Sequence, residues 1–209
     1  MTRLILVRHG QTDHNVERRL QGQVDIPLNQ TGHEQAAQAA QAFADLEHVS
    51  AVFASPLGRA ADTAQAIADA LGVDVVTDPR FLERSFGQWE GLTRDEVRAQ
   101  WPGEFAHWVG GHPVRGVGVE SRTMVGERFA EGCRDILADT PTIGSAIVVS
   151  HGAAITLGIT AMLGLEPDAF RGLHGIGNCH WSELTYATAE PPTGWMRLVS
   201  HNLPPQVRA

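Results

Sequence analysis

Three short apolar runs predict strands that are buried in a sheet. They cover residues 4–7, 51–54 and 146–149, and each consists of four consecutive apolar residues. Runs of this length, bounded by polar residues, are typical of strands covered on both faces in a parallel sheet. A further strand is expected at 73–76. The order of these segments predicts an α/β fold that opens with a β-α-β-α-β unit.

Capping residues place the first two long helices between these strands. Thr31-Gly32-His33-Glu34 is a capping-box pattern and opens an alanine-rich helix that is expected to reach about Leu46. Ser55 as the N-cap and Pro56 as the first helical residue are expected to open the next helix, which ends before Gly72.

The second half of the chain predicts further helices and a C-terminal hairpin. The helices are expected at 93–101, 121–139 and 153–163. Residues 178–186 and 195–199 alternate between apolar and polar positions like two edge strands of a hairpin. Trp181 and Tyr186 on this hairpin could mark the surface of a homodimer.

Together these elements predict a three-layer α/β sandwich with a mostly parallel open sheet, helices on both faces and an antiparallel C-terminal edge. With 209 residues and no linker-like stretch, the chain is expected to form a single domain over 1–209. The segment around 78–119 is interpreted as a cap-like insertion. Its part 101–119 is rich in aromatic residues and glycine, and it either covers the site and selects the substrate or is a packed surface insertion.

Composition and charge exclude several classes of function. The net charge of −8 argues against nucleic acid or an anionic membrane as a partner. The sequence contains no lysine, which excludes a Walker loop, a Schiff-base lysine and a pyridoxal phosphate site. No apolar run is long enough to span a bilayer and no signal peptide is recognisable, so a cytoplasmic location is expected. Cys133 and Cys179 form no metal or disulfide pattern and are expected to be buried thiols.

The candidate chemistry lies where the predicted strands end. Arg8-His9-Gly10 follows the first strand, Ser150-His151-Gly152 follows another, and Arg59 is expected in the first turn of a helix. Ligands of open α/β sheets bind beyond the carboxyl ends of the strands. If these strands are neighbours, two histidines and two arginines meet helix amino ends and form a site for a tetrahedral oxyanion. The alternative is that each motif merely ends a strand in solvent.

The sequence resembles the histidine phosphatase superfamily, which is also called phosphoglycerate mutase-like. The resemblance covers about residues 3–185 and is carried by Arg8-His9-Gly10-Gln11-Thr12, Asn15, residues 21–28, residues 55–60, Leu82-Glu83, residues 87–91, Glu120-Ser121 and Ser150-His151-Gly152. It implies hydrolysis through a phosphohistidine on His9, without a metal or other cofactor.

The resemblance also implies roles for the other site residues. Arg8, Arg59 and His151 would surround the phosphate oxygens, and Glu83 would be the general acid and base. The residues implied in binding phosphate or substrate are Asn15, Gln21, Gly22 and Gly152.

The surroundings of Glu83 bear on its role as an acid. A carboxyl group held among Phe81, Phe86 and Trp89 would lose solvation, which favours its protonated form. Arg84 would oppose this effect if it pairs with Glu83. The alternative is a surface glutamate in a salt bridge with Arg84.

Within the family the pattern favours a phosphatase. Mutases carry a tyrosine and a lysine near the substrate carboxylate, whereas this chain has Phe86 at the tyrosine position and no lysine. Residues 21–23, 120–122 and 177–181 are similar to actinobacterial members of the phosphatase branch. The expected substrate is a small phosphorylated metabolite, either a sugar phosphate or a phosphoglycerate derivative. Mutase-type transfer, a metal-dependent hydrolase built on His9 and His151, and a non-catalytic phosphate-binding module remain alternatives.

Overall fold

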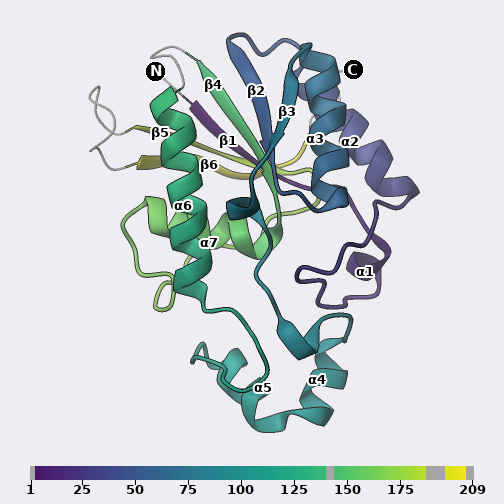
Figure 1. The fold of residues 1–209 in the computed structure, drawn as a ribbon, viewed down its shortest axis with the longest axis vertical. Coiled ribbons are helices and arrows are strands. Elements are labelled where there is room, and N and C mark those ends of the chain that lie inside the picture. Colours follow the sequence, from purple (N-terminus) through teal and green to yellow (C-terminus); the bar gives the residue numbers. More distant parts are fainter. Residues whose placement is uncertain (1–2, 140–143, 187–195, 206–209) are drawn as a thin grey trace.

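A mixed β-sheet forms the centre of the computed structural model, which describes residues 3–139, 144–186 and 196–205. Within these residues the sheet has six strands in the order β3-β2-β4-β1-β5-β6 (Figure 1). The strands are β1 Arg3–Arg8, β2 Val49–Ala54, β3 Asp74–Thr77, β4 Ser145–Ser150, β5 Trp181–Tyr186 and β6 Met196–Leu203. The pairs β1–β4, β2–β4 and β2–β3 are parallel, and β5 and β6 are antiparallel to their neighbours. The predicted mostly parallel sheet is confirmed.

Helices cover both faces of this sheet, as predicted. The helices are α1 Asp13–Val16, α2 Gln30–Phe43, α3 Gly58–Leu71, α4 Arg94–Gln100, α5 Pro102–Val109, α6 Arg122–Asp139 and α7 Gly152–Met162, with 3₁₀ turns η1 Pro79–Phe81 and η2 Gly87–Trp89. In Figure 1, α2 and α3 lie on one side of the sheet, and α6 and α7 lie on the other.

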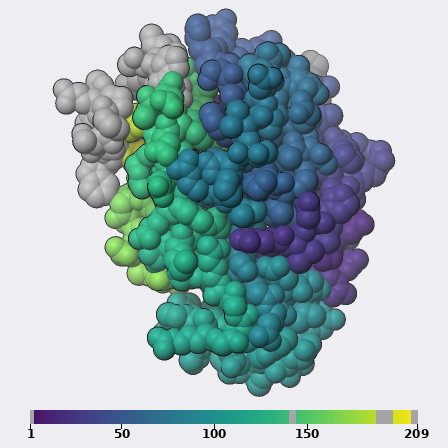
Figure 2. Space-filling model, in the orientation of Figure 1, coloured from purple at the N-terminus to yellow at the C-terminus, as the bar shows by residue number. Residues whose placement is uncertain are grey.

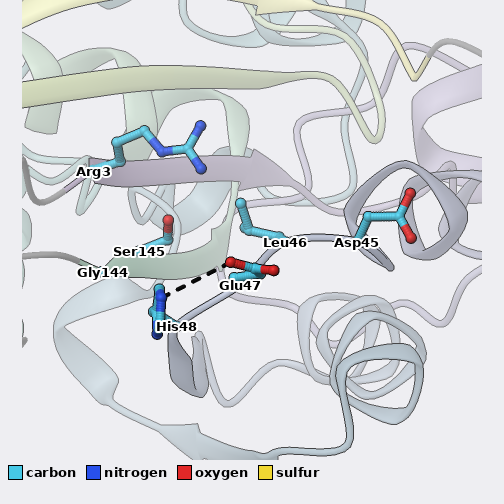
Figure 3. A pocket seen from close by; sticks show the side chains of 7 residues that line it. All are labelled: Arg3, Asp45, Leu46, Glu47, His48, Gly144 and Ser145. Carbon is cyan, nitrogen blue, oxygen red and sulfur yellow. Dashed lines mark ion pairs between the residues drawn. The ribbon is translucent and has the colours of Figure 1, made fainter.

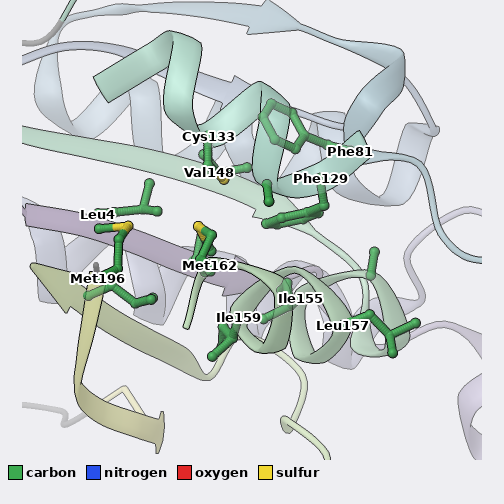
Figure 4. Packing of buried hydrophobic residues seen from close by; sticks show 14 of the residues in the cluster. Leu4, Phe81, Phe129, Cys133, Val148, Ile155, Leu157, Ile159, Met162 and Met196 are labelled. Carbon is green, nitrogen blue, oxygen red and sulfur yellow. The ribbon is translucent and has the colours of Figure 1, made fainter. Parts of the chain in front are cut away.

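Alternation along β1 divides the core between the two faces. Leu4 and Leu6 belong to the cluster formed with α6 and α7, which Figure 4 shows. Ile5 and Val7 belong to the cluster formed with α2 and α3. Because successive side chains of a strand point to opposite faces, a continuous apolar run is what a strand covered on both faces requires. The central strand is thereby fixed in depth and register.

Two predicted helix starts are wrong by a few residues. Asn29, not Thr31, caps α2, and its side chain accepts a hydrogen bond from the Gly32 N–H at 2.9 Å. Helix α2 also ends at Phe43 rather than about Leu46. Helix α3 starts at Gly58 instead of Pro56, because Ser55 and Pro56 still belong to the turn that follows β2.

Two other helix ends agree with the prediction. Gly72 ends α3 in the left-handed conformation with φ 68°, which glycine adopts without steric cost. The Ser121 hydroxyl accepts a hydrogen bond from the Met124 N–H at 3.0 Å and so caps α6.

The two C-terminal strands are antiparallel as predicted, but of these two only β6 lies at an edge of the sheet. Strand β5 lies between β1 and β6. Its first residue, Trp181, packs against Phe43 of α2 with ring centroids 4.8 Å apart. Trp195, which was expected in the second strand, lies outside the described residues.

Residues 86–119 form a small lobe of their own. Helices α4 and α5 lie at the lower end of the molecule in Figure 1, away from the sheet, and the same lobe is the teal lower part of Figure 2. Phe86, Trp89, Val97 and Val117 are its buried centre, and the residues packed around them include Trp101, Phe105 and Trp108. The aromatic residues of 101–119 therefore serve first as a local core, and part of this segment is the helix α5.

In the described part of the chain, none of the helices combines the length and the apolar character needed to cross a bilayer.

Candidate active site

Parallel pairing of β1 with β4 brings the two histidines together. Arg8 is the register partner of Ser150, and the His9 N–H continues the pairing to the Ser150 carbonyl at 2.9 Å. The rings of His9 and His151 follow directly, with centroids 5.1 Å apart. Both side chains are buried, at 2% and 0% exposure. The predicted convergence at the carboxyl ends of these strands is present.

The surroundings of His9 fix its tautomer and its charge. Nδ1 lies 2.6 Å from the Gly10 carbonyl oxygen. Because a carbonyl can only accept, Nδ1 carries the proton and Nε2 keeps its lone pair. Burial, and next the charges of Arg8 and Arg59, hold the pKa of His9 well below its usual value. The ring is therefore neutral at physiological pH, and Nε2 is available as a nucleophile.

Two arginines flank the histidines, Arg59, which is fully buried, and Arg8, which is partly buried. Arg59, in the first turn of α3, donates to the carbonyls of Val24 and Gly22, each at 2.8 Å. Arg8 donates through Nη1 to the Ile176 carbonyl at 2.7 Å. Burial lowers the pKa of both side chains, but an arginine remains a cation at neutral pH. The cluster thus concentrates positive charge around His9.

This cluster contains polar atoms that have no partner. Among the described residues, Nε of Arg8, Nε of Arg59 and both ring nitrogens of His151 are buried without a hydrogen bond. A buried unsatisfied polar group costs about 1–3 kcal/mol. A ligand that offers several oxygen acceptors would satisfy such donors, and a tetrahedral phosphate does so.

The carboxylate of Glu83 lies at the amino end of α7. It accepts hydrogen bonds from the backbone N–H groups of Ala154 at 2.8 Å, Ala153 at 3.2 Å and Arg84 at 2.8 Å. Backbone N–H groups at a helix amino end are good donors to a carboxylate. Glu83 is therefore held close to His151, the N-cap of the same helix.

The aromatic pocket predicted for Glu83 is not formed. Phe81 packs in the core beneath α6, whereas Phe86 and Trp89 belong to the lobe of 86–119. The predicted alternative of a salt bridge with Arg84 is also wrong, because no ion pair joins Arg84 to Glu83 among the described residues, and the Arg84 side chain donates to the Glu120 carbonyl at 2.7 Å. Sequence proximity to aromatic residues was misleading here, since the chain turns sharply at η1 and η2.

Three of the predicted binding residues, Asn15, Gln21 and Gly22, lie in the segment after β1, and the fourth, Gly152, is the first residue of α7. Asn15 accepts from the Asn178 amide at 3.1 Å, and the buried Gln21 accepts from the Thr12 hydroxyl at 2.9 Å. Gly22 has φ 53°, and a Cβ there would overlap the Glu90 carboxylate. A Cβ on Gly152 would lie 3.6 Å from Nε of Arg8. The loop and the amino end of α7 thus meet the charged cluster.

Three residues that sequence reasoning did not assign hold this arrangement. Arg128 of α6 donates to the carbonyls of Arg80 and Leu82, each at 2.7 Å, and pairs with Glu120 at 3.0 Å. Glu90 accepts from the Gln23 and Phe86 N–H groups, at 3.1 and 2.9 Å.

Asn178 is the third of these residues, and its amide donates to the His9 carbonyl at 3.0 Å. The available signal was that Glu90, Glu120 and Asn178 stand within segments that carry the family resemblance. The contacts of Arg128 with the Arg80 and Leu82 carbonyls and of Asn178 with the His9 carbonyl join residues far apart in sequence, so no local pattern could show these contacts.

A further pocket lies at the opposite end of the sheet from His9. The pocket in Figure 3, lined by Arg3, His48 and Ser145 among others, lies at the amino ends of β1 and β4, opposite His9. Its ion pair joins exposed side chains, Glu47 and His48, at 3.9 Å. Across the described ranges, no three histidine, cysteine, aspartate or glutamate side chains are grouped to hold a metal ion.

Comparison with known families identifies the family of this chain. The sequence model of the histidine phosphatase superfamily, branch 1, matches residues 4–196, and the chain belongs to this superfamily. The predicted resemblance is thereby confirmed.

Relatives within the family differ in their reactions. A glucosyl-3-phosphoglycerate phosphatase of Mycolicibacterium vanbaalenii is 36% identical over 198 residues, with 90% of this chain and 88% of the relative covered. A probable phosphoglycerate mutase of Cronobacter sakazakii is 36% identical over 198 residues, with 94% and 91% covered. The structure of a mycobacterial glucosyl-3-phosphoglycerate phosphatase with VO3 has a TM-score of 0.85 and 32% identity, with 96% and 99% covered.

We expect the unliganded protein to lose stability as the pH falls below about 6.5. Burial and neighbouring positive charges hold the pKa values of His9 and His151 well below 6.5 in the folded chain, whereas an unfolded histidine titrates near about 6.5. The unfolded state therefore binds more protons in this range. The free energy of unfolding should fall by up to about 1.4 kcal/mol per pH unit for each ring. Urea unfolding in phosphate-free buffer at a series of pH values measures this slope.

A matched pair of variants assigns the slope to the site. His151→Gln removes one titrating ring and should reduce the slope by about half. His33→Gln, on the exposed surface of α2, should leave it unchanged. Equal slopes for wild type and His151→Gln would contradict a neutral, buried His151.

Proposed function

We propose that this protein is a metal-independent phosphatase that hydrolyses a small phosphorylated metabolite through a phosphohistidine on His9. The observation that supports this best is the neutral His9 ring, whose Nδ1 donates to the Gly10 carbonyl at 2.6 Å while the charges of Arg8 and the buried Arg59 act on the ring. A nucleophilic nitrogen surrounded by cationic donors fits the demands of phosphoryl transfer.

In the first step, Nε2 of His9 attacks phosphorus and the bond from phosphorus to the ester oxygen breaks. Arg8, Arg59 and His151 bind the non-bridging oxygens and stabilise the charge that shifts onto them. Protonated Glu83 gives its proton to the leaving oxygen, so the alcohol leaves uncharged.

In the second step, the resulting Glu83 carboxylate takes a proton from water, and the water oxygen attacks phosphorus. The nitrogen–phosphorus bond breaks, inorganic phosphate forms, and His9 returns to its neutral state. These steps require no metal, because cationic side chains take the charge-stabilising role. Asn15, Gln21, Gly22 and Gly152 are assigned to binding phosphate or substrate around the reacting group.

Hydrolysis is favoured over phosphate transfer between substrate positions. Phe86 replaces the tyrosine of the mutase pattern, and its ring is buried in the lobe of 86–119, where it offers no hydroxyl to a substrate. The relatives named as glucosyl-3-phosphoglycerate phosphatases support the same choice. The proposed substrate class is a sugar phosphate or a phosphoglycerate derivative.

A substrate panel tests the proposal. Phosphate release is measured from p-nitrophenyl phosphate, 3-phosphoglycerate and glucosyl-3-phosphoglycerate in the presence of a chelator. We expect turnover that resists the chelator and falls by several orders of magnitude in His9→Ala, because the nucleophile is lost. Isomerised phosphoglycerate without release of phosphate would indicate a mutase instead. Activity that is lost to the chelator but kept by His9→Ala would overturn the proposal.

The role of Glu83 is tested by the leaving group. Glu83→Gln should slow hydrolysis of 3-phosphoglycerate by about 100- to 10,000-fold, the usual contribution of general acid–base catalysis. The first step with p-nitrophenyl phosphate should lose much less, because its leaving group needs little protonation. Glu127→Gln, on the exposed side of α6, is the matched control. An equal loss with both substrates would show that Glu83 is not the acid.

A further inference from the structure

The residue that follows His9 is a glycine, whose backbone needs support from elsewhere. Gly10 is buried, and a Cβ there would overlap the Gly32 carbonyl oxygen. Glycine restricts its own dihedral angles less than any other residue does. The Gly10 carbonyl is nevertheless the acceptor that sets the tautomer of His9. Other residues must therefore fix the backbone at this position.

Two side chains hold the peptide group between His9 and Gly10. The Gly10 N–H donates to the Thr63 hydroxyl oxygen at 3.1 Å. The His9 carbonyl accepts from the Asn178 amide at 3.0 Å. Because a peptide group is planar, fixing both its N–H and its C=O fixes the orientation of the whole plane. That plane determines the backbone dihedral angles on either side of it, directly beside the nucleophile.

The hydroxyl of Thr63 is oriented to accept from Gly10. Thr63 is fully buried in α3, one turn after Arg59, and its hydroxyl donates to the Arg59 carbonyl at 2.7 Å. Because a carbonyl can only accept, the hydroxyl hydrogen is committed there and the oxygen is left to accept. Thr63 thus ties the backbone beside the nucleophile to the helical turn that carries the Arg59 cation.

The amide of Asn178 orients a second residue of the site. It also donates to Oδ1 of Asn15 at 3.1 Å, and this oxygen accepts from the Thr12 N–H at 3.1 Å as well. The Nδ2 group of Asn15 therefore remains as the donor that can meet a ligand. One amide thus holds both the backbone of the nucleophile and a side chain assigned to binding.

The next peptide group links the held plane to the imidazole ring. Its C=O, on Gly10, accepts from Nδ1 of His9 at 2.6 Å, and its N–H, on Gln11, donates to Oε1 of Gln35 at 2.9 Å. A rotation of the preceding plane would draw this carbonyl away from the ring, because the two planes share the Cα atom of Gly10. A neutral imidazole without that acceptor can carry its proton on either nitrogen, and a proton on Nε2 blocks the attack.

We propose that Thr63 and Asn178 are positioning residues for the reaction of His9. By holding the peptide group before Gly10, they keep the Gly10 carbonyl against Nδ1 and so keep Nε2 unprotonated and aimed at phosphorus. This inference rests on the proposed phosphohistidine mechanism and adds to it two side chains that act through the backbone.

Thr63→Val tests the proposal, because valine keeps the shape of threonine but cannot accept from Gly10. The rate at which His9 takes the phosphoryl group is measured as p-nitrophenol release in the first turnover of p-nitrophenyl phosphate. We expect this rate to fall at least about tenfold, because a small displacement of reacting groups can cost about 100-fold. Binding of inorganic phosphate, measured by calorimetry, should change less than about threefold, because the charged donors remain.

Two matched variants separate positioning from a general loss of stability. Thr63→Ser keeps the hydroxyl and should restore most of the wild-type rate. Thr160→Val removes the hydroxyl of another buried threonine, which donates to the Thr156 carbonyl at 2.8 Å in α7, and it should leave the rate unchanged. An equal slowing by Thr63→Val and Thr160→Val, or no slowing in folded Thr63→Val, would overturn the proposal.

A measurement without turnover keeps the test independent of the phosphatase activity. In protein with isotope-labelled histidine, the NMR signals of His9 are assigned by their loss in His9→Gln. Exchange of the Nδ1 proton with water is then followed in phosphate-free buffer. We expect this exchange to be at least about tenfold faster in Thr63→Val and in Asn178→Ala, because the Gly10 carbonyl no longer protects the proton.

The two variants also guard against a failure to fold, since Asn178→Ala carries the test if Thr63→Val is unfolded. Faster exchange in a protein that hydrolyses no phosphate ester would support the positioning role and contradict only the proposed function. Wild-type exchange of the Nδ1 proton in every folded variant would overturn the positioning role, whatever the activity.

Discussion

The parallel pairing of β1 with β4 is the constraint on which the site depends. It ends at Arg8 and Ser150, and the next residue of each strand is a histidine whose ring is buried beside the other. The apolar run of β1 is covered on both faces, so its register cannot slip without exposing core residues. The positions of the two rings therefore follow from the same burial that stabilises the fold.

Buried positive charge and unsatisfied nitrogens are the cost of this arrangement. Nε of Arg8, Nε of Arg59 and the His151 ring have no partner in the described structure. Arg59 is held in place by its hydrogen bonds to the Val24 and Gly22 carbonyls. Arg128 in turn holds the segment that leads into Glu83, because it donates to the Leu82 carbonyl. Proteins with such binding sites commonly have a lower free energy of unfolding when the ligand is absent. Binding of an oxyanion to the folded protein should therefore raise the free energy of unfolding.

Sequence reasoning predicted the elements and the central residues because their signals are local. A continuous apolar run followed by Arg8-His9-Gly10 marks both a buried strand and its reactive end. The start of α2 was missed because Asn29 and Thr31 are both good caps, and only tertiary contacts decide between them. The setting of Glu83 was missed because its partners, Ala153 and Ala154, are 70 and 71 residues away. The roles of Arg128 and Asn178 depend on similarly distant contacts.

Hydrolysis by this site, as proposed, requires His9 to carry the phosphoryl group during turnover. The most direct measurement mixes the protein with p-nitrophenyl phosphate, quenches the reaction with alkali within a turnover, and maps enzyme-bound phosphate by mass spectrometry. We expect phosphate on the peptide that contains His9, and we expect acid to remove it, because a phosphoramidate is labile in acid. Acid-stable phosphate on another side chain, or turnover with the His9 peptide always unmodified, would contradict this mechanism.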